Sequence, residues 1–338
     1  MELKVFESPK KEWDEFASQY TDLNYYQSIW SEVLRKGLGG QPLYFYLKEG
    51  GEIVAGLPGI LLDFKIFKIL YASIPYGNLI GKRSYFQPFQ LLLEKEFRKR
   101  GIDQVRIAES PFSESYPFDK FKSVPARSTL LDLSGFDPTR IWESYRSEVR
   151  RAIRKAQKNG LVVKRATSER EVKIFYQLYL SSMERNRAGA KYPPKWFDAV
   201  YGILVSQQMA DILFAVKGDE HTAGVVVVYS PTVHHYLHNG SDKAHLEKRP
   251  NDLIVDYLIQ NGIKKRKTFL DFMGSDRNDL SLIRFKEKWG SQSLDLHTYI
   301  KDYHPLRSKI WEAGKNMAAS RWGSKLVRLF GRGLKVKE

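Results

Sequence analysis

The chain of 338 residues contains no cysteine, which excludes disulfide bonds, thiolate zinc sites and a cysteine nucleophile. Glycine and proline interrupt its apolar runs, such as the one at residues 53–62. No run therefore reaches the roughly 18 residues that a membrane span needs. The first residues, MELKVFESPKKEW, lack the apolar stretch of a signal peptide. We expect a cytoplasmic protein.

Common catalytic and ligand-binding motifs are absent from the sequence as well. It has no HExxH motif and no G-x-S-x-G elbow. Residues 77–84 resemble a phosphate-binding loop only superficially, because Arg83 stands where Ser or Thr would hold magnesium. His234 and His238 fall on one face of a predicted strand, but no acidic residue at ligand spacing accompanies them. The sequence therefore predicts no metal site and no bound cofactor.

Positive charge is present in excess. Lys and Arg number 55 against 39 Asp and Glu, a net charge of +16, which favours anionic partners such as RNA, anionic lipid or nucleotide sugars. Residues 315–337 contain seven basic residues and no acidic one. Residues 307–334 predict a basic amphipathic helix able to lie on the inner surface of an anionic membrane; the alternative is a helix packed on the second half of the chain. Its apolar residues are Trp311, Met317, Trp322, Leu326, Leu329 and Phe330.

Two stretches of the chain repeat one order of predicted elements. The order is two strands around a glycine turn, a third strand, a loop, an amphipathic helix and a further strand. It occurs at residues 43–109 and again at 211–273, and each stretch follows a pair of predicted helices. Two unrelated α/β domains are the alternative. The matched lengths and turn positions favour an internal duplication, and we expect the two stretches to superpose.

A basic helix is predicted between the halves at residues 143–160, with Val149 and Ile153 on its apolar face. It is either a solvated linker or a surface for phosphate or RNA. Both halves also carry a Phe-Lys pair followed by a strand, Phe121-Lys122 and Phe285-Lys286. The basic residues of this helix are Arg146, Arg150, Arg151, Arg154, Lys155 and Lys158.

The order of the elements resembles the core of GNAT acyltransferases. We therefore predict an α/β fold with two tandem GNAT-like domains, each a mixed, mostly antiparallel sheet flanked by helices. The predicted parts are domain 1 at residues 1–140, the connecting basic helix at 141–160, domain 2 at 161–303 and a basic helical tail at 304–338. We expect a monomer.

The loop that binds coenzyme A in typical GNAT enzymes is missing. There, a Q/R-x-x-G-x-G/A segment lets backbone N–H groups cradle the pyrophosphate. The corresponding segments, 80–88 and 240–251, lack these glycines. Lys243, Lys248 and Arg249 could contact an anion through their side chains instead. We expect coenzyme A to bind weakly or not at all.

Six segments together resemble the FemABX family, the aminoacyl-tRNA-dependent transferases of peptidoglycan cross-bridges, and the wider group of acyltransferases around it. The resemblance covers nearly the whole chain up to about residue 300. The segments are YQSIW at 26–30, VRRAIRKAQKNGLVV at 149–163, SSMERNRAGAKYPPKWF at 181–197, HYLHNGSDKAH at 235–245, FLDFMG at 269–274 and LIRFKEKWGS at 282–291.

The resemblance implies a transfer site around the second Phe-Lys pair. Phe285 and Lys286 match the pair that lines the site in the family, where the ammonium is thought to stabilise the charge that builds on the ester. Lys286 lies at the edge of a predicted buried stripe, so we expect an exposed side chain that reaches a cleft and matters little for folding. The other implied substrate-binding residues are Trp30, Arg35, Lys36, Tyr76, Lys191, Trp196, His238 and Arg249.

The sequence departs from the family at several of these positions. Compact members have tyrosine where Trp196 and His238 stand. Leu34 replaces a phosphate-contacting Lys, with Arg35 and Lys36 beside it, and Lys191 lies next to the position of a phosphate-contacting Arg. These departures affect the choice of substrate more than the reaction class.

Three functions remain open. The first is aminoacyl transfer from a charged tRNA to an amine of a nucleotide- or lipid-linked cell-wall precursor. The second is N-acyl transfer from coenzyme A or a carrier protein to an amino sugar or polysaccharide precursor. The third is a non-catalytic RNA- or membrane-associated protein. The basic charge, the missing glycine loop and Phe285-Lys286 favour the first. No general base is evident, although Asp271 and Asp276 fall near the expected cleft.

Overall fold

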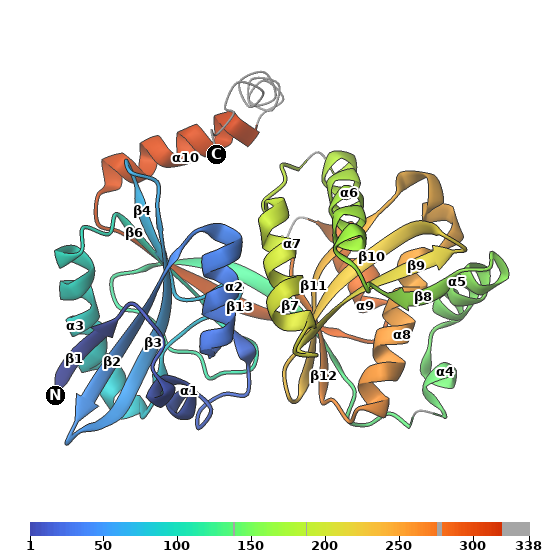
Figure 1. Cartoon of the computed structure of the whole chain (residues 1–338). Helices are drawn as coiled ribbons and strands as arrows, with labels where there is room; N and C mark the ends of the chain where they lie inside the picture. The colour runs from blue at the N-terminus through green and yellow to red at the C-terminus, as the bar shows by residue number, and fades with distance from the viewer. Residues whose placement is uncertain (138, 187, 276–278, 320–338) are drawn as a thin grey trace.

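The computed structural model describes residues 1–137, 139–186, 188–275 and 279–319. Two groups of helices lie beside one another, and one continuous sheet runs through both (Figure 1). The elements of the first half are β1 (Glu2–Phe6), α1 (Lys11–Ala17), α2 (Ser28–Leu38), β2 (Gln41–Glu49), β3 (Glu52–Asp63), β4 (Lys68–Tyr71), β5 (Ile80–Gly81), α3 (Phe86–Lys99), β6 (Gln104–Ala108) and β7 (Lys122–Asp132).

The second half repeats this series after two connecting helices. Its elements are α4 (Ile141–Ser144), α5 (Ser147–Lys158), β8 (Val162–Arg165), α6 (Glu169–Arg185), α7 (Pro194–Val200), β9 (Ala210–Lys217), β10 (Glu220–Tyr229), β11 (Val233–Ser241), α8 (Pro250–Lys264), β12 (Phe269–Gly274), α9 (Leu280–Glu287), β13 (Gln292–Asp302) and α10 (Pro305–Ala319).

The strand order of the sheet is symmetric about its centre. It runs β1-β2-β3-β4-β6-β13-β7-β12-β11-β10-β9-β8, with β5 beside β3. On each side one pair is parallel, β4 with β6 and β11 with β12, and the other neighbours are antiparallel. The α/β class, the internal repeat and the mixed, mostly antiparallel sheets are therefore confirmed.

The last strand of each half crosses to the other half. β13 lies between β6 and β7, and β7 pairs with β12. The two exchanged strands pair with each other at the centre, from Gln292 opposite Leu130 to Ile300 opposite Lys122. Sequence order does not reveal this exchange, because the pairing of distant strands is decided by tertiary contacts. The sheet is thus continuous, and the two halves repeat the same strand order within it.

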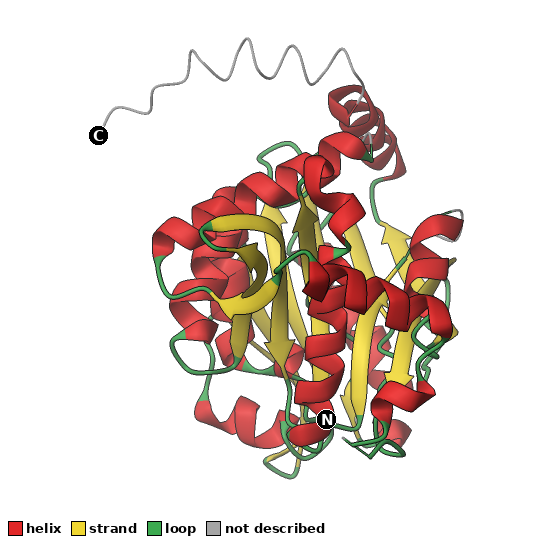
Figure 2. Ribbon diagram, turned by 90° about the vertical axis from the view of Figure 1, so that its right-hand side faces the viewer, coloured by secondary structure: helices red, strands yellow, loops and turns green. Residues whose placement is uncertain are grey.

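Alternating side chains cover the two faces of the sheet. Along β2, Tyr44 and Tyr46 enter the core beneath α1 and α2, while Leu43 and Phe45 enter the core beneath α3. In the second half α6 and α7 cover the first of these faces, and α5 and α8 cover the other. The core beneath α1, α2, α6 and α7 extends across both halves. Figure 2 shows helices on both sides of the twisted sheet.

The two Phe-Lys pairs do not occupy equivalent places in the two halves. Phe285 and Lys286 lie in α9, whereas Lys122 is the exposed first residue of β7 and Phe121 precedes it in a turn. The segment before Phe121 contains two prolines, Pro111 and Pro117. Proline has no backbone N–H, so two donors that a helix would use are missing. Only the second half therefore presents a lysine from a helix at this point.

The C-terminal helix packs on the first half, not on the second. Trp311 of α10 stacks on Phe67, with ring centroids 5.2 Å apart, and contacts Phe64 at 4.5 Å, both in the turn between β3 and β4. The predicted apolar residues from Trp322 onward lie outside the described residues, as does the side chain of Met317. Within the described ranges, no helix is long and apolar enough to cross a bilayer.

Candidate functional site

Helices α2 and α7 meet at the junction of the two halves. An added Cβ at Gly37 of α2 would lie 2.9 Å from the Trp196 ring, so the helices approach too closely for a larger residue. The rings of Trp30 and Trp196 meet edge to face at 5.7 Å. Tyr25 packs against Trp30 at 4.8 Å and against Tyr76 at 5.9 Å. A continuous run of aromatic side chains therefore joins the halves.

A neutral histidine ends this aromatic run. His238 Nε2 accepts a hydrogen bond of 2.9 Å from Trp196 Nε1, and the ring of Tyr192 lies 4.4 Å from the imidazole. Burial lowers the pKa of His238 to about 3. The uncharged ring can accept the indole N–H bond, and it is not available as a proton donor at neutral pH.

A β-bulge decides which face the histidines of β11 occupy. Tyr236 pairs with Val227 and His238 pairs with Val226, so Leu237 is an extra residue in the ladder. The bulge shifts the alternation by one, and His238 joins His235 on the face of α7 while His234 faces α8. The prediction that His234 and His238 share a face is wrong for this reason.

A buried polar network lies beneath the aromatic run. The Asp271 carboxylate is 3.1 Å from His235 Nδ1 and accepts a hydrogen bond of 3.2 Å from the Ser128 hydroxyl. Tyr76 OH lies 2.9 Å from Ser128 Oγ, and His235 Nε2 lies 3.1 Å from Ser230 Oγ. Ser128, His235 and Asp271 are fully buried. The network unites β7, β11, β12 and the loop that carries Tyr76, so it ties the two halves together.

Lys286 is buried, contrary to the expectation of an exposed side chain. Its Nζ donates to the carbonyls of Met273 at 2.8 Å and Gly274 at 3.1 Å, and to Ser275 Oγ at 2.7 Å. Burial lowers the pKa of Lys286 to about 8, and the carboxylate of Asp271 opposes that shift. Gly274 is exposed and Ser275 half-buried, so the ammonium lies just beneath the surface. The apolar stripe of α9 was identified, but the short distance from α9 to β12 was not evident from the sequence.

Asp271 and Lys286 are connected through the backbone of Met273. The Asp271 carboxylate accepts a 2.7 Å hydrogen bond from Met273 N–H, and the Met273 carbonyl accepts from Lys286. Met273 has a φ of 63°, which is uncommon for a residue with a side chain and is a sign of local strain. The carboxylate therefore holds the strained turn that receives the ammonium.

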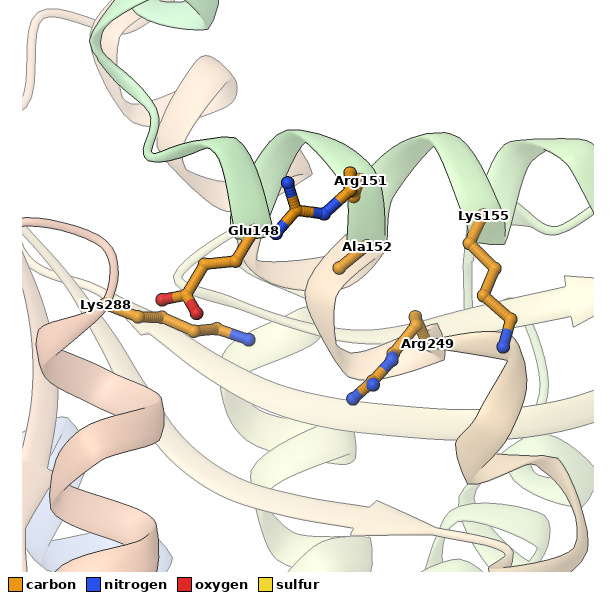
Figure 3. A pocket seen from close by; sticks show the side chains of 6 residues that line it. All are labelled: Glu148, Arg151, Ala152, Lys155, Arg249 and Lys288. Carbon is orange, nitrogen blue, oxygen red and sulfur yellow. The ribbon is translucent and has the colours of Figure 1, made fainter.

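A basic pocket of about 270 Å³ lies at the N-terminus of α8. Arg249, with a φ of 62°, immediately precedes Pro250, the first residue of that helix. In Figure 3 the Arg249 side chain points between those of Lys155 and Lys288. The free N–H groups at a helix start favour an anion. The pocket is lined by Glu148, Arg151, Ala152, Lys155, Arg249 and Lys288.

Lys288 connects this pocket to the core beneath α5 and α8. It pairs with Asp252 in the first turn of α8 and lies 4.5 Å from the centre of the Phe285 ring. Phe285 packs with Trp289 in the core beneath α5 and α8. Phe285 and Lys286 therefore point to different sides of α9, and the structure does not bring Phe285 to the aromatic run.

The remaining predicted residues lie apart from the junction. Arg35 and Lys36 are exposed on α2 and both pair with Glu32, at 2.7 and 3.4 Å. Arg35 and Lys36 hold the pKa of Glu32 below its usual value. Lys191 is exposed, and its backbone N–H donates to Tyr179 OH at 2.9 Å. The structure thus brings together Trp30, Tyr76, Trp196 and His238, links Lys286 to them through Asp271, and places Arg249 in the basic pocket.

Sequence reasoning missed His235, Ser128 and Tyr25 as members of the site. Asp271 was noted only as a strand-end carboxylate. His235 and Asp271 lie opposite each other on the parallel strands β11 and β12, and this register comes from the structure and not from the spacing along the chain. Among the described residues, no group of three or more His, Cys, Asp or Glu side chains could hold a metal ion.

Comparisons with known proteins support an acyltransferase fold. Residues 143–287 match the family described as Acetyltransferase (GNAT) domain. A search of curated proteins finds no match. The chain is similar in structure to FemX, with 12% identity, a TM-score of 0.61, and coverage of 87% of this chain and 96% of that one.

Two further solved structures match most of the chain. L-PGS from Bacillus licheniformis matches with 13% identity and a TM-score of 0.59, covering 89% of this chain and 95% of that one. A tandem GNAT protein from the clavulanic acid biosynthesis pathway matches with 11% identity and a TM-score of 0.58, covering 89% and 98%. At these identities the likeness is one of fold, and it confirms the tandem GNAT-like arrangement.

Proposed function

We propose that this chain, which carries a GNAT acyltransferase domain and has the tandem fold of FemX-like proteins, transfers an aminoacyl group from a charged tRNA to an amine of a cell-wall precursor. The observation that carries the proposal is the Lys286 ammonium, held by three hydrogen bonds next to the junction of the halves. The chain shares its fold with FemX over 96% of that protein's length, and this fold is compatible with the reaction.

Lys286 would act on the charge that develops during transfer. When an amine attacks an ester carbonyl, negative charge builds on the carbonyl oxygen, and a cation already in place lowers the barrier. The carbonyl of Gly274 is the partner most easily exchanged, because Gly274 is exposed and its hydrogen bond is the longest of the three at 3.1 Å, while Met273 is buried. A pKa of about 8 leaves the group mostly charged at neutral pH. The amine would lose its own proton as the ester bond breaks, and the tRNA hydroxyl would be the leaving group.

The basic pocket supports a large anionic donor. Its cations are side chains from three segments, Arg151 and Lys155 of α5, Arg249 before α8 and Lys288 after α9, instead of a glycine loop. The exposed face of α5 adds Arg154 and Lys158. A row of cations along a helix fits a nucleic-acid backbone better than a single pyrophosphate.

The acceptor would lie at the partly exposed end of the aromatic run, at His238. Trp30 and Tyr76 of the first half and Trp196 of the second are buried, so both halves shape the junction beneath it. An amine attached to a cell-wall precursor would reach the ammonium from this side. The exposed pair Arg35 and Lys36 is occupied by Glu32, so nucleotide phosphates would need to displace that carboxylate.

A second candidate is N-acyl transfer from coenzyme A to an amino sugar or polysaccharide precursor. The match of residues 143–287 to GNAT acetyltransferase domains favours it. Isothermal titration with acetyl-coenzyme A separates the two donors. We expect weak or undetectable binding, and micromolar binding would replace the first function by the second.

The direct test measures binding and transfer with aminoacyl-tRNA. Arg151→Glu with Lys155→Glu should weaken tRNA binding at least about tenfold and flatten its salt dependence. The matched control is Lys95→Glu with Lys99→Glu, a change of the same charge on the exposed face of α3 in the first half. Equal losses in both variants, or transfer that does not depend on tRNA, would contradict the proposal.

A further inference from the structure

Exposed apolar side chains gather where α10 meets the turn between β3 and β4. Phe64 is 44% exposed and Ile66 72% exposed in the turn, and Leu306 and Ile310 are 77% and 70% exposed on α10. Leu306 and Ile310 are one helical turn apart and so lie on one side of the helix. These four exposed side chains lie on two elements that meet at Trp311, and together they are called the apolar patch.

The patch is held in a fixed arrangement. Trp311 joins its two parts, because its ring stacks on Phe67 and contacts Phe64. Arg307 pairs with the buried Asp103 at 3.2 Å and anchors the start of α10 to the first half. Figure 1 shows α10 lying across the end of the first half, beside the start of β4. The apolar side chains are thus presented by packed elements, with Lys65 at the tip of the turn.

Positive charge surrounds these apolar side chains. Lys65 and Lys309 are exposed within the patch, and the nearby Asp63 is already paired with Lys68 at 3.3 Å. The sequence from 315 to 337 adds seven basic residues and no acidic one. A second copy of the chain, or its own basic C-terminal sequence, would bring like charge to this patch. An anionic lipid surface complements both the apolar and the basic side chains.

We propose that Phe64, Ile66, Leu306 and Ile310 dock on the surface of an anionic membrane. The turn and α10 would lie in the headgroup region, with the cations against lipid phosphates. Ile74, whose carbonyl accepts a hydrogen bond from Trp30, is seven residues from Phe67. A chain of that length spans at most about 25 Å. Docking would therefore hold the aromatic run close enough to the bilayer to meet a lipid-linked acceptor.

The absence of cysteine allows a site-specific test on the full chain. Ile66→Cys and Ile310→Cys are each labelled with an environment-sensitive fluorophore, and Leu91→Cys on α3, also an exposed apolar position, is the matched control. The labels at 66 and 310 should shift to shorter wavelength with vesicles of phosphatidylglycerol and phosphatidylcholine, and the shift should decrease with salt. The label at 91 should not respond.

Co-sedimentation with the same vesicles provides the second measurement. Ile66→Asp with Ile310→Asp should reduce the bound fraction at least about tenfold without changing the melting temperature, because both side chains are exposed. The proposal is overturned by equal binding to phosphatidylcholine alone, by equal response at position 91, or by a spectral shift that needs only a higher protein concentration. Transfer to a soluble acceptor does not depend on the patch, so failure here leaves the proposed reaction untouched.

Discussion

The two halves of the sheet share their scaffold but differ in chemistry. By the register of the parallel pairs, Tyr71 and Arg106 of the first half occupy the places of His235 and Asp271 in the second. His235 and Asp271 form a fully buried pair, whereas Tyr71 and Arg106 are partly exposed. Duplication therefore supplied the same strands twice, and the buried carboxylate was placed in only one copy.

The helix that follows the repeat differs in the same way. The second half has α9 between β12 and β13, and the first half has a proline-containing loop between β6 and β7. The start of α3 is likewise unlike that of α8, since Arg83 there pairs with Glu114 at the surface. The buried lysine and the cations of the basic pocket thus come from the second half and the helix that connects to it. The exchanged strands β7 and β13 pair with each other at the centre and join the two halves of the sheet.

The largest expected effect concerns the buried lysine. Lys286→Met keeps the volume of the side chain and removes its charge, so turnover should fall roughly 100-fold or more, on the order of 3 kcal/mol. The melting temperature should also fall, because the buried Met273 carbonyl loses its donor. Single-turnover transfer from aminoacyl-tRNA, normalised to the folded fraction, measures the effect.

Lys122→Met in the first half is the matched control for this change. Lys122 is exposed at the start of β7, and we expect no change in either measurement. Equal loss in both variants would make the halves functionally equivalent. Normal turnover of the Lys286→Met protein would make that lysine structural.

A smaller effect is expected for the carboxylate. Asp271→Asn removes the charge that opposes the lowering of the Lys286 pKa, so that pKa should fall further below about 8. The rate should then decline at lower pH than in the parent protein, with roughly tenfold loss at pH 8. The pH–rate profile is the readout, and Arg106→Gln at the equivalent position should leave the profile unchanged. An unshifted profile in Asp271→Asn would remove the proposed link.

The aromatic junction should have a milder influence. Trp196→Phe removes the donor to His238 Nε2 and leaves a buried acceptor unpaired, costing about 1–3 kcal/mol of stability. We expect the KM for the acceptor to rise about fivefold, with little change in kcat. Trp13→Phe, which removes a comparable buried N–H bond to the Tyr26 carbonyl in the first half, is the control. A similar KM in both variants would show that the junction does not affect acceptor binding.

The smallest effect is on stability as a function of pH. The pKa of Lys286 is about 8 in the folded chain and returns towards 10.5 when the chain unfolds. Between these values the unfolded chain binds more protons, so this group should make the free energy of unfolding rise with pH. Urea denaturation of the parent and of Lys286→Met measures the difference. Identical slopes in the two proteins would show that the ammonium is not desolvated.

The sequence by itself determined the repeat and most of its elements. Strand alternation, glycine turns and helical spacing depend on neighbouring residues, and they located the strands and helices of both halves. Trp30, Tyr76, Trp196 and His238 were selected through a resemblance to a family, and the structure brings them together. Whether they bind substrate stays a prediction.

Only the tertiary structure decided how the halves join and which groups are buried. The exchange of β7 and β13 depends on pairing between strands more than 150 residues apart, which no local pattern encodes. The bulge at Leu237 reversed the faces of the histidines, because one added residue shifts the alternation. Lys286 became buried because the Met273 turn lies within hydrogen-bond reach of α9. Burial and electrostatics depend on such distances in space, and spacing along the chain does not fix them.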